Sequence, residues 1–374
     1  MKNAQGELDL FSAADITLYM PCYNAGKMLD RSVAQILSQS IKPAAILLMD
    51  DGSSPALELS PKLAEMQKGW PLEIIRDPVN RGLASVRNAA LARCRTRLIA
   101  SLDADVAAEH NWLEMLLNAI NAQHVAGVGG RLDEFYQESL ADRWRAVHMA
   151  QHWGDNPVLN PRFIYGANSL FQAEILCSAG GYHSSLRTNY EDMSLSEKLY
   201  SQKHMLYYEP AAKCRHLRRD NLRSVLPGFW KWYHAKGVIQ GEFDSPEGLL
   251  GRIERVNFGI FRHRFDMDAN AGRKEFLILD LLLPWVFCAL DLELAQRLKK
   301  IPCPAFPNVS QLEFMPAPLR KLLPEILAPS QNTGTTEPWH ESYYKLFEES
   351  LNNSWHHRIK LCGDAPWPKE DDIR

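Results

Sequence analysis

Short apolar runs alternate with polar, loop-like stretches in the N-terminal part of the chain. The apolar runs are residues 16–20, 45–49, 72–75 and 97–100, and helical patterns follow at residues 28–38 and 83–93. Strands that alternate with helices predict an α/β fold in which a mixed, mostly parallel sheet is flanked by helices. The runs are almost entirely apolar, as strands buried on both faces of a sheet require.

Each of these apolar runs ends in a polar loop. In open α/β sheets, ligands bind beyond the carboxyl ends of the strands, so we expect the loops to gather around one site. The loops read Pro21-Cys22-Tyr23-Asn24-Ala25-Gly26, Asp50-Asp51-Gly52-Ser53, Asn80-Arg81-Gly82 and Asp103-Ala104-Asp105.

Two carboxylates one residue apart, Asp103 and Asp105, follow the fourth apolar run. Alternate residues of a strand point to the same side, so both carboxylates leave the strand on one side. Oxygen ligands on one edge suit a hard divalent cation such as Mg²⁺ or Mn²⁺, whose open positions can carry phosphates. Taken alone, the pair is more typical of an ordinary turn, so the metal hypothesis depends on the other loops.

In this order and spacing, the loops resemble those of family 2 glycosyltransferases, which have the GT-A fold. The resemblance covers about residues 13–220. Each motif is weak by itself, whereas the ordered set is specific. The later motifs that extend the resemblance are Arg87-Asn88, Gly166-Ala167-Asn168, Gly180-Gly181-Tyr182 and Tyr190-Glu191-Asp192-Met193.

The resemblance implies a nucleoside diphosphate sugar as the donor substrate, with a UDP-sugar favoured. A carboxylate of Asp50 or Asp51 would accept hydrogen bonds from the base or ribose; an Asp-Gly turn is the structural alternative. Arg81 or Arg87 would add charge beside the diphosphate, because guanidinium groups match phosphate oxygens; for Arg87 a solvated helix face is the alternative. The donor-binding residues expected on this basis are Pro21, Tyr23, Asn24, Asp50, Asp51, Asn80, Gly82, Arg87, Asp103 and Arg219.

The resemblance also implies a divalent metal, Mn²⁺ or Mg²⁺, that neutralises the leaving diphosphate. Asp105 would be the direct ligand, and Asp103 would hold a metal-bound water or the ribose. His216 ends a strand-like stretch and is a candidate third ligand, with a structural histidine as the alternative. Arg218 and Arg219 would bind the diphosphate or form a solvated basic turn.

Glu191 and Asp192 precede a helical pattern. Acidic residues are favoured in the first turn of any helix, so helix stabilisation alone could explain them. In the family, the Asp of this pair is the catalytic base, which must lie within hydrogen-bond reach of the acceptor hydroxyl. The resemblance therefore implies an inverting transfer with Asp192 as the base, while Glu191 contacts the acceptor or orients Asp192.

The length predicts two domains, a catalytic domain at residues 1–225 and a mainly helical region at residues 226–374. The apolar stretch at residues 276–294 is interrupted by charged residues and Pro284, so it predicts a buried or interfacial helix and not a membrane span.

The Gln-x-x-Arg-Trp motif of processive synthases is missing, because the chain reads Gly228-Phe229-Trp230-Lys231-Trp232 there. We therefore expect an enzyme that transfers one sugar at a time.

Two aromatic stretches lie in the C-terminal region, at residues 229–236 and 339–355. Packing into a helical core is the favoured interpretation of both. The alternatives are a membrane surface for the first stretch and an acceptor platform for the second. The region would recognise the acceptor, form homo-oligomers or dock on a membrane, and the sequence does not choose among these roles.

Composition limits the partners and the compartment. A net charge of -3 over 374 residues gives no reason to expect nucleic acid as a partner. Seven scattered cysteines without a Cys-x-x-Cys pair indicate a reducing compartment. Residues 1–14 lack a signal-peptide pattern. We therefore expect a cytoplasmic protein, and peripheral association with the inner face of the membrane stays open.

The expected acceptor is a saccharide in surface polysaccharide biosynthesis, although a lipid-linked or protein acceptor is equally compatible with these residues. Two other classes of function stay open. A sugar nucleotidyltransferase would need a Gly-rich loop with Arg and Lys after the first strand, where the chain supplies only Gly26. A catalytically inactive binding or scaffold subunit would have no need to keep Asp103, Asp105 and Asp192 together.

Overall fold

The computed structural model describes residues 10–298, 300–307, 317–327, 337–362, 366 and 368. The chain divides into two compact units. The first, which we call the sheet unit, comprises Met1–Tyr136 and Ala150–Arg218. The second, the helical unit, comprises Gln137–Met149 and Arg219–Arg374.

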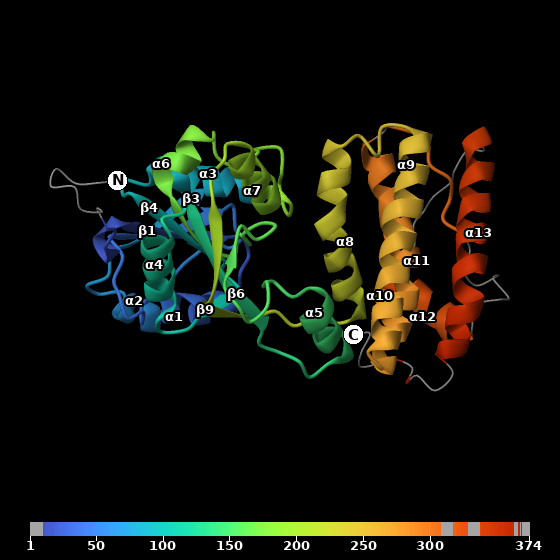
Figure 1. Cartoon of the computed structure of the whole chain (residues 1–374), viewed down its shortest axis with the longest axis horizontal. Helices are drawn as coiled ribbons and strands as arrows, with labels where there is room; N and C mark the ends of the chain where they lie inside the picture. Colours follow the sequence, from blue (N-terminus) through green and yellow to red (C-terminus); the bar gives the residue numbers. More distant parts are fainter. Residues whose placement is uncertain are drawn as a thin grey trace. The chain divides into compact units, whose positions relative to one another are not determined.

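One mixed sheet forms the centre of the sheet unit (Figure 1). Its strand order is β3-β2-β1-β4-β8-β6-β9-β5, with β7 paired to β9. β3, β2, β1 and β4 are parallel, β8 is antiparallel to both of its neighbours, and β6 and β9 are parallel to each other. The strands are β1 Ile16–Cys22, β2 Ala45–Asp51, β3 Leu72–Asp77, β4 Leu98–Leu102, β5 Val106–Ala108, β6 Gly127–Glu134, β7 Val158–Leu159, β8 Asn168–Gln172 and β9 Leu206–His216.

Helices flank this sheet and bury its apolar strands. β1, β2 and β4 are buried along nearly their whole length, which is why their sequences are almost continuously apolar. The expected mixed, mostly parallel sheet with flanking helices is confirmed, and so are the strands and helices expected in its first half. The helices are α1 Met28–Ile36, α2 Pro61–Met66, α3 Leu83–Arg93, α4 Trp112–Gln123, α6 Ala173–Ser178 and α7 Glu191–Ser201, with a short 3₁₀ turn η1 at Ala13–Asp15.

The register of the parallel strands brings their carboxyl ends to one edge. Cys22 at the end of β1 pairs with Asp50, and Asp51 at the end of β2 pairs with Asp77. The polar loops that follow these strands therefore start side by side, as expected of an open α/β sheet.

The helical unit is built from long helices that lie side by side, with helix α5 joining them from an earlier part of the chain (Figure 1). Its core is rich in aromatic and leucine side chains. The helices are α5 Leu140–His148, α8 Leu222–Ile239, α9 Pro246–Arg252, the π-helix η2 Ile253–Phe258, α10 Gly259–Asn270, the 3₁₀ helix η3 Lys274–Phe276, α11 Leu277–Leu298, α12 Ala317–Ile326 and α13 Pro338–Leu361.

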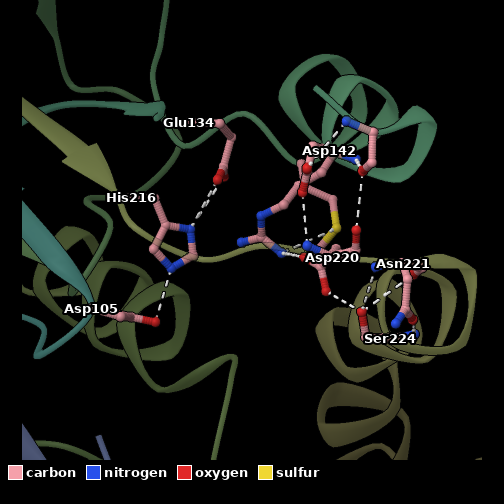
Figure 2. Close-up of polar contacts among 10 residues, drawn as sticks. Asp105, Glu134, Asp142, His216, Asp220, Asn221 and Ser224 are labelled. Atoms are coloured by element: carbon pink, nitrogen blue, oxygen red, sulfur yellow. Dashed lines mark hydrogen bonds and ion pairs between the residues drawn. The ribbon is translucent and has the colours of Figure 1, made fainter. Parts of the chain in front are cut away.

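The border between the units differs from the expected one at residues 225 and 226. The helical unit contains the chain from Arg219 onward, and it also contains the earlier segment at residues 137–149. Trp144 of α5 is fully buried in the helical core, and Asp142 accepts a hydrogen bond from the backbone N–H of Asp220 at 2.7 Å (Figure 2). Contacts with residues far away in the chain therefore hold α5 in the helical unit, and the local sequence of α5 does not predict them.

α11 is the apolar helix expected at residues 276–294, and most of its side chains are buried. No helix in the described part of the chain combines the length and the apolar character needed to cross a membrane. The aromatic stretches follow the core interpretation in part: Phe229, Tyr343 and Phe347 are buried in the helical core, whereas Tyr344 is 41% exposed. The side chain of Trp355 lies outside the described residues.

Candidate functional site

A small cavity lies at the carboxyl edge of the sheet, against the loop after β1 and the loop after β4. It measures about 170 Å³, and Pro21, Tyr23, Asp103 and Asp105 are among its lining residues. Small-molecule sites usually measure roughly 300–1,000 Å³, so this cavity can enclose only part of a nucleotide-sugar. Four of the predicted site residues thus meet at one place. The half-exposed ring of Tyr23 gives the cavity an aromatic wall.

Asp50 and Asp51 line a different cavity, of about 280 Å³, together with Arg76 and Arg81. Asp50 accepts hydrogen bonds from the backbone N–H of Ser53 at 2.9 Å and from Arg76. Burial raises the pKa of Asp50, but the hydrogen bonds from Ser53, Leu57 and Arg76 outweigh it and lower the pKa below its usual value. Asp50 is therefore a charged carboxylate that holds its own loop together.

Asp51 holds the loop that follows β3. Its carboxylate accepts hydrogen bonds from the backbone N–H groups of Arg81 at 2.8 Å and Gly82 at 2.9 Å. The amide of Asn80 donates to the backbone oxygen of Asp51 at 3.2 Å. A carboxylate has about four acceptor positions, so Asp51 keeps capacity for a ligand beside these two donors.

Asn24 links the loop after β1 to the loop after β2. Its backbone N–H donates to Ser53 Oγ at 3.0 Å, and its side-chain oxygen accepts from the N–H of Ser54 at 2.9 Å. Asn24, Asp51, Asn80 and Gly82 thus fix the shape of the loops at this edge.

The second carboxylate of the Asp-x-Asp pair lies beside a histidine. Asp105 Oδ2 is 2.9 Å from His216 Nε2, and His216 Nδ1 is 3.2 Å from both carboxylate oxygens of Glu134 (Figure 2). The imidazole is buried between the two carboxylates. Burial lowers the pKa of His216, but Asp105 and Glu134 outweigh it and raise the pKa to about 9.

This arrangement fits a divalent metal through its donor set. An imidazole nitrogen next to a carboxylate oxygen suits Mn²⁺ or a similar ion, and a second carboxylate on the far ring nitrogen is the usual orienting partner of a metal-bound histidine. Asp103 faces another partner, Arg87. Among the described residues, Asp103, Asp105 and His216 do not form a group of three ligand atoms within 4.8 Å of one another.

Arg87 is a buried hub and does not face solvent; its side chain is 1% exposed. One guanidinium nitrogen donates to Tyr19 Oη at 3.2 Å, Ser101 Oγ at 2.7 Å and the backbone oxygen of Gly166 at 2.9 Å. The other terminal nitrogen donates to Asp103 Oδ1 at 3.2 Å. The solvated-face alternative for Arg87 is therefore wrong, and its direct partners are protein groups.

The carboxylates at the start of α7 lie on the other side of Arg87. Arg87 Nε is 3.6 Å from Glu191 Oε1. Burial and the neighbouring Asp192 raise the pKa of Glu191 to about 8, against the opposing effect of Arg87. Burial also raises the pKa of Asp192, whose carboxylate accepts hydrogen bonds from Gly166 N–H at 3.1 Å and Met193 N–H at 2.7 Å.

The comparison with known families decides the identity of the sheet unit. The family described as "Glycosyl transferase family 2" matches residues 17–187, which span β1 to the loop before α7. Residues 17–187 match a glycosyltransferase family 2 domain. The resemblance seen in the sequence is thereby confirmed, and with the observed sheet it identifies the fold as GT-A.

Individual relatives match part of the chain. The chain is 28% identical over 221 residues to a pre-mycofactocin glycosyltransferase of Mycobacterium tuberculosis (strain CDC 1551 / Oshkosh), covering 58% of this chain and 45% of that protein. It is 22% identical over 236 residues to a poly-beta-1,6-N-acetyl-D-glucosamine synthase of Staphylococcus aureus (strain COL), covering 61% and 55% of the two proteins. The chain thus spans about half the length of these curated relatives.

A solved structure, that of S. aureus TarS, aligns with 76% of this chain and 53% of its own. The TM-score is 0.45, and the sequence identity is 13%.

Arg219 is the predicted donor residue that the structure places outside the family 2 domain. It is assigned to the helical unit, and its guanidinium is 3.2 Å from the carboxylate of Glu138. Both side chains are exposed. Its role toward a diphosphate stays a prediction.

Sequence reasoning missed Glu134, Tyr19 and Ser101. Glu134 ends β6, and the parallel pairing of β6 with β9 sets it opposite His216. Tyr19 and Ser101 lie within buried strands, where they hydrogen-bond Arg87. A carboxylate at a strand end was a visible signal for Glu134, but the strand pairing that gives it meaning is not written in the local sequence.

Proposed function

We propose that this chain transfers a single sugar from a nucleoside diphosphate sugar, with a UDP-sugar favoured, to an acceptor hydroxyl with inversion. The observation that carries the proposal is the link through Arg87. This buried cation joins Asp103 of the donor cavity to Glu191, the neighbour of the candidate base Asp192. The family 2 match over residues 17–187 and the glycosyltransferase and synthase names of the relatives add support.

Different side chains would bind the nucleoside and the metal ion. Tyr23 and the loops held by Asp50 and Asp51 would bind the nucleoside, and Asp105 with His216 would hold Mn²⁺ or Mg²⁺. When bound, such an ion supplies positive charge that stabilises the leaving diphosphate. Glu134 keeps the imidazole of His216 turned toward Asp105.

Asp192 would accept the proton of the acceptor hydroxyl. The acceptor oxygen then forms its bond to the anomeric carbon while the bond from that carbon to the diphosphate oxygen breaks, and the diphosphate leaves with the electron pair. Asp192 retains acceptor capacity beside the bonds from Gly166 and Met193, because a carboxylate offers about four positions. Its raised pKa makes it a better base than an ordinary aspartate.

The decisive experiment compares the wild type with Asp192→Asn. Release of UDP from a panel of UDP-hexoses with saccharide acceptors should fall by about 10²–10⁴-fold, the usual contribution of a general base. Thermal stabilisation by UDP with Mn²⁺ should stay, because the substitution leaves the donor cavity intact. GDP, dTDP and CDP are tested in parallel to identify the base.

Glu58→Gln is the control, since Glu58 is an exposed carboxylate of the same unit; it should change neither property. Full activity in Asp192→Asn would refute the base assignment. Absence of a Mn²⁺-dependent shift with every nucleotide would instead favour the binding-subunit alternative.

The acceptor is proposed to be a saccharide of a surface polysaccharide, with lipid-linked and protein acceptors still open. No observation on the described residues favours nucleotidyl transfer. The cytoplasmic location, the peripheral membrane association and the homo-oligomer expected from the sequence stay predictions.

A further inference from the structure

The helical unit contains a second cluster of ligand-type side chains, far in sequence from the Asp-x-Asp pair. It consists of His148 at the end of α5, Asp268 in the last turn of α10 and Asp280 in the first turn of α11. One ligand atom from each residue lies within 4.8 Å of the other two, and no other such group occurs among the described residues. Asp268 and Asp280 are completely buried, and His148 is 3% exposed.

Donors outside the cluster orient both carboxylates. Trp144 Nε1 donates to Asp280 Oδ1 at 3.0 Å, and Arg273 Nε donates to Asp268 Oδ1 at 2.7 Å. Each carboxylate is thus held by one oxygen, which leaves its second oxygen for the interior of the cluster. Asp268 Oδ2 lies 2.8 Å from His148 Nε2.

Asp280 Oδ2 is the atom that points to a missing partner. It is shielded from solvent and has no hydrogen-bond donor, and the neighbouring carboxyl of Asp268 can bond it only through a shared proton. A buried carboxylate oxygen without a partner costs free energy, so a cation or a proton is needed beside it. Arg273 does not fill this role, because it contacts the outer oxygen of Asp268 and its side chain is 30% exposed.

We propose that His148, Asp268 and Asp280 bind a divalent transition-metal ion, with Zn²⁺ the expected ion. Imidazole nitrogen and carboxylate oxygen both ligate zinc, and outer partners such as Trp144 and Arg273 are typical of ligating carboxylates. The ion would fasten α5 to α10 and α11 and stabilise the helical unit. The site is independent of the proposed sugar transfer.

Asp280→Asn distinguishes a metal ion from a shared proton. Asparagine has nearly the shape of a protonated carboxyl and can still donate to Asp268, but it is a poor metal ligand. The experiment is done in the Asp105→Ala background, which removes the ligand proposed at the donor site. Zinc per chain is measured after treatment with EDTA and dialysis against Zn²⁺, together with the melting temperature in EDTA and in Zn²⁺.

The Asp105→Ala protein should bind about one Zn²⁺ per chain and melt at a higher temperature in Zn²⁺ than in EDTA. The Asp105→Ala, Asp280→Asn protein should bind none and melt in EDTA at the same temperature as its parent. Equal zinc content in the two proteins, or no zinc in the parent, would overturn the site and leave a proton shared by the two carboxyls.

Co²⁺ provides a readout that does not require a substitution within the cluster. A site with nitrogen and oxygen ligands gives visible absorption bands without the strong ultraviolet band of a thiolate ligand. That spectrum in the Asp105→Ala protein supports the cluster. A thiolate band would assign the ion to cysteines and overturn the proposal.

Discussion

Arg87 carries a positive charge in a place that water does not reach. Removing such a charge from water is costly, so its partners must compensate it with charges and acceptors of their own. Asp103 and Glu191 supply carboxyl groups, and Tyr19 and Ser101 supply further acceptors. One residue therefore connects the Asp-x-Asp pair with the start of the helix that carries the candidate base.

Glu134 gives the first prediction at the residue scale. Glu134→Gln should weaken Mn²⁺ binding by about 10–100-fold, because the amide orients His216 less well than a carboxylate. Mn²⁺ binding is measured by paramagnetic resonance in the Asp280→Asn background, so that the helical cluster does not contribute. Glu58→Gln should leave the affinity unchanged, and an unaltered affinity in Glu134→Gln would show that Glu134 has no role in orienting a ligand.

At the scale of elements, the loop between β3 and α3 depends on a glycine. Gly82 has a φ of +93°, and a Cβ there would lie 2.8 Å from the Cα of Arg187. Its N–H donates to Asp51, and the N–H of Leu83 donates to the backbone oxygen of Arg187 at 2.7 Å. The start of α3 is thus fixed between two other loops of the site, which leaves no room for a side chain.

Gly82→Ala should therefore lower the free energy of unfolding of the sheet unit by at least about 1–3 kcal/mol, which is the usual cost of a strained backbone conformation. The contact of the new Cβ with Arg187 adds to this loss. Gly69→Ala is the matched control: its φ is +82°, but a Cβ would meet nothing within 4 Å. Urea unfolding of both variants separates the two effects. Equal losses in the two variants would mean that the contact with Arg187 contributes nothing.

At the scale of the whole molecule, two buried groups make stability depend on pH. Glu191 has its pKa raised from 4.5 to about 8 on folding, so the native state binds a proton that the unfolded chain releases. This contribution is complete below pH 4.5 and is lost as the pH rises to about 8. The pKa of His216 is raised from 6.5 to about 9, so its contribution to folding stability is lost between these two pH values.

The metal-free protein should thus become less stable from about pH 7 to pH 9, above the range in which the lowered pKa values of His148, His152 and His234 have the opposite effect. Glu191→Gln should flatten the dependence of stability on pH between about pH 5 and 8. Glutamine stays neutral, so the variant has no proton to release at this position as the pH rises. Thermal unfolding in EDTA across this range checks it. Parallel curves for the two proteins would contradict the raised pKa of Glu191.

Much of the sheet unit was predictable from local pattern. β1, β2 and β4 are buried along nearly their whole length, so their sequences are almost continuously apolar, and α3 has the expected bounds. The ordered motifs also predicted the family, because their order and spacing resemble those of family 2 glycosyltransferases. Their partners were not predictable, because Glu134 meets His216 only through the pairing of β6 with β9.

The sequence by itself thus determined the fold class, the family and the residue types of the site, because these depend on local periodicity and on short motifs. Only the tertiary structure decided that Arg87 is buried, that Asp50 and Asp51 line a separate cavity from Asp105, and that α5 joins the helical unit. These features rest on contacts between residues far apart in the chain. Burial and strand register arise when such residues meet, and neither is encoded within one short segment.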